Sequence, residues 1–251
     1  EQFSDAGVAV FAADIKGDLC GLGAAGSPQG KIAERIASMP WLDHRPQAYP
    51  VTLWDVHGRS GHPLRTTLSE MGPLLLGNLL QLTDSQQSAL FAAFKVADRE
   101  GLLLLDLKDL KALLAHLKAE PQMLGEDSAL FTAASSQALL RRLATLEQQG
   151  AEALFGEPAL QLEDILQPAP DGRGVIHLLD ASTLVHEAPK VYATFLLWLL
   201  AELFEQLPER GDADRPVLAL FFDEAHLLFG DTPKALQERL VQVVRLIRSK
   251  G

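Results

Sequence analysis

Residues 218–229 read LALFFDEAHLLF, an apolar run that ends on two adjacent acids, Asp223 and Glu224. Three other short apolar runs also end on an aspartate: VAVFAA before Asp14, VTLW before Asp55 and VIHLL before Asp180. Such runs are typical of strands buried on both faces of a parallel sheet. Because ligands bind outside the carboxyl ends of parallel strands, the sequence predicts an α/β fold with these acids along one functional edge. A loop-starting or helix-capping role remains the alternative for Asp14, Asp55 and Asp180.

Composition narrows the class of protein. The chain has 251 residues, and its net charge of −11 argues against a broad nucleic-acid-binding surface, although a local basic loop is compatible with it. The single cysteine, Cys20, excludes an internal disulfide and suits a reducing compartment.

With no basic-then-apolar leader in the first residues, we expect a cytoplasmic location. The apolar run Phe195–Phe204 is far shorter than the roughly 20 residues of a membrane span, so it predicts a buried helix and no membrane partner.

The middle of the chain has helical rather than strand-like periodicity. Apolar residues recur at helical spacing over Ser85–Asp98, over the stretch DLKDLKALLAHLKAE that starts at Asp106, and over residues 135–149. We therefore predict an inserted α-helical subdomain with no strand between Thr83 and Gly150. The expected division is a first part of the α/β core at 1–65, the helical insertion at 66–170, and a second part of the core at 171–251. A further helix is predicted after the cap at Thr232.

The acid pair after the fourth apolar run has a recognised chemistry. In P-loop ATPases the first acid helps to hold Mg²⁺, usually through its water shell, and the second polarises the water that attacks the γ-phosphate. Asp223 and Glu224 match that order, whereas the plain alternative is a strand that ends in a charged turn.

The matching phosphate-binding motif, G-x-x-x-x-G-K-[ST], does not occur in these 251 residues. The nearest lookalike, GSPQGKI at residues 26–32, is one residue short and has Ile32 in place of the hydroxyl residue. It is interpreted as a surface loop.

Several stretches together resemble a known family. They are ADIKGDLCGL (13–22), LWDVHGRSGHPLRTTLSEMGPLLL (53–76), FKVADREGLLLLDLKDLKALL (94–114), FGEPAL (155–160), YATFLLWLLAELFEQLPERGD (192–212), FFDEAHLLF (221–229) and VVRLIRSKG (243–251). In these stretches the chain resembles the HerA-like ATPases of the HerA/FtsK superfamily, specifically the bacterial family with a helicase HerA-like C-terminal domain. The resemblance covers nearly the whole chain.

The resemblance implies a RecA-like P-loop core with a mainly parallel sheet, in an ATP-hydrolysing DNA translocase or helicase-like motor. It implies ATP and Mg²⁺ as cofactors, and a homo-oligomer, a ring hexamer, as the assembly. It also implies that the phosphate loop (Walker A) lies before Glu1 and that a sensor strand follows Gly251. On that basis we expect a piece of a longer protein, inactive by itself.

The resemblance also assigns residues. Asp223 takes the Mg²⁺-holding Walker B position and Glu224 the catalytic one, while Asp14 is a cofactor-binding candidate near the nucleotide. Arg245 and Arg248 are candidates for an arginine finger that stabilises charge on a neighbouring subunit's phosphate. For the two arginines a solvated helix face is the alternative.

Two other function classes remain open. The chain could be a non-catalytic oligomerisation or interaction module, or part of an ATPase that remodels protein rather than DNA.

The histidines His57 and His62 lack the spacing of a zinc site. Ser60 with His57 and Asp55 lacks the strained elbow of a catalytic serine.

Overall fold

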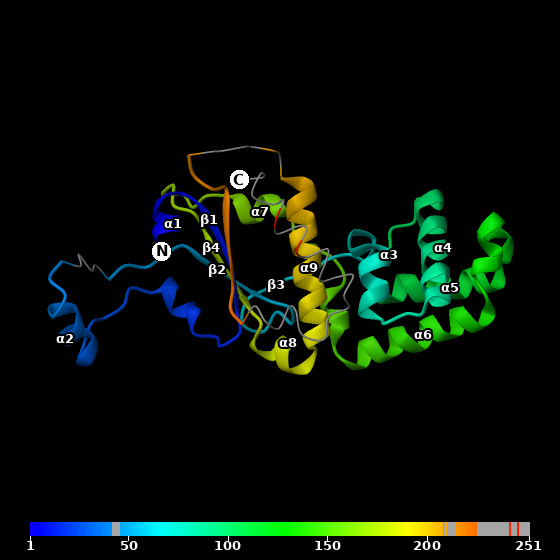
Figure 1. The fold of residues 1–251 in the computed structure, drawn as a ribbon, viewed down its shortest axis with the longest axis horizontal. Helices are drawn as coiled ribbons and strands as arrows, with labels where there is room; N and C mark the ends of the chain where they lie inside the picture. The colour runs from blue at the N-terminus through cyan, green and yellow to red at the C-terminus, as the bar shows by residue number, and fades with distance from the viewer. Residues whose placement is uncertain (42–45, 208, 210–213, 225–240, 242–244, 246–251) are drawn as a thin grey trace.

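The computed structural model describes residues 1–41, 46–207, 209, 214–224, 241 and 245. The molecule is elongated, with a twisted sheet towards one end, a block of helices at the other, and the long helix α9 (Pro189–Gln206) between them (Figure 1). The helix predicted after Thr232 lies outside the described residues, apart from Val241 and Arg245, which are helical.

The sheet has five parallel strands in the order β3-β2-β4-β1-β5. Their bounds are β1 Ala9–Asp14, β2 Val51–Asp55, β3 His62–Pro63, β4 Ile176–Asp180 and β5 Leu218–Phe222. The α/β fold and the four strands predicted from apolar runs are confirmed. The short β3 was not predicted, because two residues, one of them a proline, carry no periodic signal.

The strand register brings the strand-end aspartates together. Asp180 of β4 pairs with Asp14 on one side and with Asp55 on the other. Asp223 follows Phe222, which pairs with Ala13. The prediction that these acids share the carboxyl edge of the sheet is therefore confirmed.

One face of the sheet is buried against α9. Phe11 of β1 and Leu179 of β4 pack into the same core as Phe195, and all three are fully buried. The helix α9 is apolar on nearly every side because it is packed by the sheet and also by α3 (Leu68–Leu79), α7 (Leu162–Leu166) and α8 (Ser182–Glu187). The prediction of a buried helix at Phe195–Phe204 is confirmed. Within the described part of the chain, no helix combines the length and the apolar character needed to cross a bilayer.

The opposite face of the sheet has a smaller cover. Its buried cluster consists of Val10 and Ala12 of β1 with Ile176 and Leu178 of β4. The 3-10 helix η1 (Leu19–Gly23) supplies Leu19 and Leu22 to its rim.

The helical block begins at α3 and packs on α9. It continues with α4 (Asp84–Glu100), α5 (Leu107–Ala119), the 3-10 segment η2 (Pro121–Leu130), α6 (Ala133–Gln148) and η3 (Ala151–Leu154). Side-chain caps set its starts: Thr67 forms a capping box with Glu70, and Asp106 and Thr132 accept N–H groups of the first turns of α5 and α6. The structure describes all of residues 83–150 and has no strand there. The expected domain limits at 65 and 170 stay a prediction.

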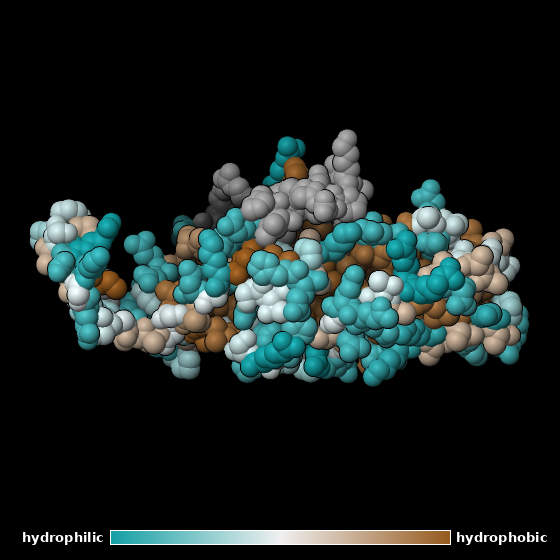
Figure 2. Space-filling view, turned by 90° about the horizontal axis from the view of Figure 1, so that it is seen from below, coloured by the Kyte–Doolittle hydropathy of each residue, from teal (hydrophilic) through white to brown (hydrophobic). Residues whose placement is uncertain are grey.

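Two short helices lie near the amino end of the chain. The first, α1 (Gln2–Asp5), leads into β1. The second, α2 (Lys31–Ala37), projects from the sheet end of the molecule (Figures 1 and 2). Residues 26–32, the lookalike of a phosphate loop, are all exposed and follow no strand directly, in agreement with a surface segment. Figure 2 shows α2 set apart from a body whose viewed face is largely hydrophilic.

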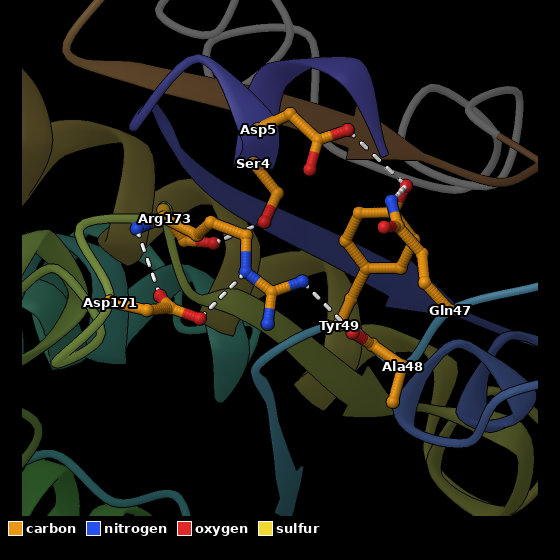
Figure 3. A network of polar contacts seen from close by, with 8 residues as sticks. Ser4, Asp5, Gln47, Ala48, Tyr49, Asp171 and Arg173 are labelled. Carbon is orange, nitrogen blue, oxygen red and sulfur yellow. Dashed lines mark hydrogen bonds and ion pairs between the residues drawn. The ribbon is translucent and has the colours of Figure 1, made fainter. Parts of the chain in front are cut away.

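The amino end of the sheet is closed by contacts between segments that are distant in sequence (Figure 3). The Ser4 hydroxyl donates to the Gly174 carbonyl at 2.6 Å, and the Gly174 N–H donates to the Ser4 carbonyl at 2.8 Å. The Arg173 guanidinium donates to the Ala48 carbonyl at 2.9 Å and lies 5.7 Å from the centre of the Tyr49 ring. These bonds join α1, the segment before β2 and the turn before β4.

Candidate functional site

The acid pair occupies the turn that directly follows β5. The Asp223 N–H still donates to the Ala13 carbonyl at 3.4 Å, so the pairing of β5 with β1 continues one residue beyond the strand. Glu224 then adopts a left-handed backbone conformation with φ of 49°, and its N–H donates to Asp223 Oδ1 at 2.9 Å. A positive φ is uncommon for a residue with a side chain, and such strain is concentrated at functional sites. The chain therefore turns sharply at its two adjacent carboxylates.

A lysine from the neighbouring loop lies against both acids. Lys16 Nζ is 3.8 Å from Asp223 Oδ2 and 3.6 Å from Glu224 Oε1. The side chain of Lys16 is 61% exposed, and those of Asp223 and Glu224 are 37% and 40% exposed, so solvent reaches all three. Sequence reasoning missed Lys16. The available signal was its place two residues after a strand-ending aspartate, but the pairing of β1 with β5 could not be read from the sequence.

Asp14 shapes the loop that carries Lys16. The residue is only 4% exposed, and its two carboxylate oxygens accept the N–H groups of Gly17 at 2.8 Å and Leu19 at 2.9 Å. Gly17 has φ of +72°, a conformation that favours glycine. The geometry thus supports the loop-starting role that was the alternative for Asp14. Its assignment to cofactor binding stays a prediction.

Asp55 and Asp180 also hold turns at the same edge. Asp55 accepts the N–H groups of His57, Arg59 and Ser60. Burial alone would raise the pKa of Asp55, but these donors outweigh it and hold the pKa below its ordinary value. Asp180 accepts the N–H group of Ser182 at 3.1 Å.

Ser60 links these two aspartates. Its hydroxyl lies 3.3 Å from Asp55 Oδ2 and donates to Asp180 Oδ2 at 3.1 Å. A hydroxyl held between two carboxylates serves to join the β2 and β4 ends.

A buried hydroxyl lies within the electrostatic field of Asp223. The side chain of Tyr192, in the first turn of α9, is 1% exposed, and its hydroxyl has no hydrogen-bond partner among the described residues. Burial, and secondarily the charge of Asp223, raise the pKa of Tyr192 to about 12. A buried polar atom without a hydrogen-bond partner is uncommon. A bound water or ligand that supplies the missing hydrogen bond explains such an atom.

The two acids fit a divalent cation of the magnesium type. Among the described residues, no group of three or more His, Cys, Asp or Glu side chains could hold a metal ion. Mg²⁺ needs few protein carboxylates because it keeps several waters and binds phosphate oxygens. The ammonium group of Lys16 already lies within 4 Å of both carboxylates, which shows that this position accommodates a cation.

The two arginines proposed as a finger differ in what the structure describes. Arg245 is exposed and helical, whereas Arg248 lies outside the described residues. The arginine-finger role of both residues stays a prediction.

Comparison with known proteins now adds to the geometry. A search of curated proteins finds no match. The sequence model of the family described as helicase HerA-like C-terminal matches residues 1–251, which is the whole chain, and confirms the resemblance. Together with the parallel α/β sheet, which is consistent with a RecA-like core, this match shows that the chain belongs to the helicase HerA-like C-terminal family.

Proposed function

We propose that the chain contributes the acid pair of an ATP-hydrolysing, DNA-translocating motor of the HerA/FtsK type. The observation that carries the proposal is the pair itself: two adjacent carboxylates, at the carboxyl end of a parallel strand, that lie near the Lys16 ammonium group and remain open to solvent. Family membership supports a helicase-type motor at the coarse level.

Each acid has a distinct role in this proposal. Glu224 accepts the proton of the water that attacks the γ-phosphate, since its side chain is accessible and its backbone is held in one tight turn. Asp223, which is anchored to β1 through its N–H, orients the waters around Mg²⁺. When bound, Mg²⁺ neutralises charge that develops on the phosphate oxygens.

The proposal needs a second element, a site that holds the phosphates. No G-x-x-x-x-G-K-[ST] motif occurs among these 251 residues, and the proposal assigns that site to residues outside them. The ring hexamer and the DNA substrate belong to the same proposal. With a net charge of −11, contact with DNA requires a local basic surface rather than the whole molecule.

The test is steady-state phosphate release by the full-length gene product, together with its nucleotide affinity. Glu224→Gln should lower turnover by about 10²–10⁴-fold, the usual contribution of a positioned proton acceptor, and should spare ATP binding. Asp223→Ala should weaken Mg²⁺-dependent nucleotide binding as well. The matched control is Glu126→Gln in the exposed part of η2, which should behave as the parent.

The outcomes separate the function classes. Turnover of Glu224→Gln at the parent rate would remove Glu224 as the base and leave the pair as a charged turn. No turnover by the full-length parent would favour a non-catalytic module. Stimulation by DNA supports the translocase, whereas stimulation by a protein substrate alone would favour a protein-remodelling ATPase.

A further inference from the structure

Lys16 has a defined position in the loop after β1. That loop is held by Asp14, whose carboxylate binds Gly17 and Leu19, the residues on the carboxyl side of Lys16. The pairing of β1 with β5 then sets this loop beside the acid turn. The position of the Lys16 backbone, within reach of the two carboxylates, therefore follows from these three contacts.

The Lys16 ammonium group interacts with one oxygen of each acid. A bound metal ion would use the same two oxygens. The ammonium group lies 3.8 Å from Asp223 Oδ2 and 3.6 Å from Glu224 Oε1. These separations are ion-pair distances rather than close hydrogen bonds, and the lysine stem is long, flexible and largely exposed. Such exposed pairs are weak, so a doubly charged ion can displace the ammonium at little cost.

We propose that Lys16 is a positioning residue that neutralises the acid pair while the site is empty and competes with Mg²⁺ for it. Before the metal arrives, the ammonium group offsets the repulsion between two adjacent carboxylates. When the metal binds, the Lys16 ammonium group moves away from the carboxylate oxygens. Its charge remains near the acid pair. The inference rests on the proposed function in taking Mg²⁺ as the ion that this edge binds.

The test measures cation binding without nucleotide, on the full-length gene product. Mn²⁺ is the probe, and free Mn²⁺ is counted by its paramagnetic resonance signal. In Lys16→Met no exposed ion pair has to be broken before the metal binds, so Mn²⁺ binding should strengthen by up to about fivefold. Lys16→Arg, which keeps the charge, should stay near the parent. The gain should shrink as salt is raised.

Two controls locate the effect. Lys31→Met removes a lysine from the exposed α2 and should leave Mn²⁺ affinity unchanged. Asp223→Ala should lose the site. Equal or weaker Mn²⁺ binding by Lys16→Met, or no Mn²⁺ bound by either protein, would overturn the proposal.

The Mn²⁺-binding test of Lys16 can succeed or fail independently of the test of ATP hydrolysis. If the parent binds Mn²⁺ and Lys16→Met binds it more tightly, competition at the acid pair stands even where no ATP is hydrolysed. If Glu224→Gln abolishes turnover but Lys16→Met leaves both Mn²⁺ affinity and the Mg²⁺ concentration for half-maximal turnover unchanged, the role of Lys16 is rejected and the function is kept.

Discussion

The two ends of the same sheet are built differently. At the amino end, side chains form hydrogen bonds with main-chain groups of three segments. Ser4, which donates one of these bonds, is completely buried, and Gly174 lies where no other residue fits. At the carboxyl end, two accessible carboxylates lie within 4 Å of the Lys16 ammonium group, Glu224 has a positive φ, and the buried Tyr192 hydroxyl has no hydrogen-bond partner among the described residues. One end of the strands is arranged for stability. The other keeps charge and strain, which is where proteins depart from local rules for function.

The largest expected effect is at the amino end, from Gly174→Ala. A Cβ atom at Gly174 would lie 1.9 Å from the Val8 carbonyl oxygen and 2.2 Å from its carbon, both of them backbone atoms that cannot move aside cheaply. We expect the free energy of unfolding to fall by more than about 3 kcal/mol in urea titration. Gly26→Ala, where nothing lies within 4 Å of the added atom, is the matched control. A similar small loss for both variants would mean that the amino end is not tightly closed.

The next effect concerns His177, near the amino end of β4. Its Nδ1 accepts the Trp54 Nε1–H at 3.0 Å, and burial lowers its pKa to about 4. Because the folded pKa lies below the unfolded value of about 6.5, the unfolded state binds more protons between these values. Stability should therefore fall by about 3 kcal/mol as the pH is lowered through this window, and the loss should level off below it.

The check on His177 compares urea unfolding of the parent and of His177→Gln from pH 7 to pH 4. The variant should lose most of the excess slope, because glutamine does not titrate. His116→Gln, on the exposed side of α5, should keep the parent slope. Identical slopes for the parent and His177→Gln would contradict a buried neutral imidazole.

A smaller loss is expected from Ser4→Ala at the amino end. The variant removes the 2.6 Å bond to the Gly174 carbonyl and leaves that acceptor with one partner fewer in a buried place. We expect a loss of about 1–2 kcal/mol in the free energy of unfolding. Ser27→Ala in the exposed segment before α2 should change it little. A neutral Ser4→Ala would show that water replaces the hydroxyl and that the amino end is open.

The smallest effect, of opposite sign, is expected at the carboxyl end from Tyr192→Phe. Removing a buried hydroxyl that has no partner in the described part of the chain should raise the free energy of unfolding by about 1 kcal/mol. Tyr49→Phe serves as the control, since the Tyr49 hydroxyl is exposed and lies 3.3 Å from Asp5 Oδ2. A destabilised Tyr192→Phe would mean that the hydroxyl already has a partner, and the contrast between the two ends would then be weaker.

Much of the fold could be predicted because its signals are local. Four apolar runs ending in aspartate became four strands, helical spacing located α4, α5 and α6, and the apolar run Phe195–Phe204 located the buried α9. The helix α3 was missed, since Gly72 and Pro73 interrupt its pattern. The short β3 was missed for lack of length. The two-residue strand forms only because β2 is beside it.

The sequence by itself determined that acids end the strands and that Asp223 and Glu224 stand next to each other. Only the tertiary structure decided which of these acids are buried within their own turns and which remain accessible. That division depends on strand order, because β1 must lie beside β5 before the Lys16 loop can meet the acid pair. Apolar periodicity and caps depend on neighbours a few residues away, whereas a contact between residues 16 and 223 depends on how the whole sheet is assembled.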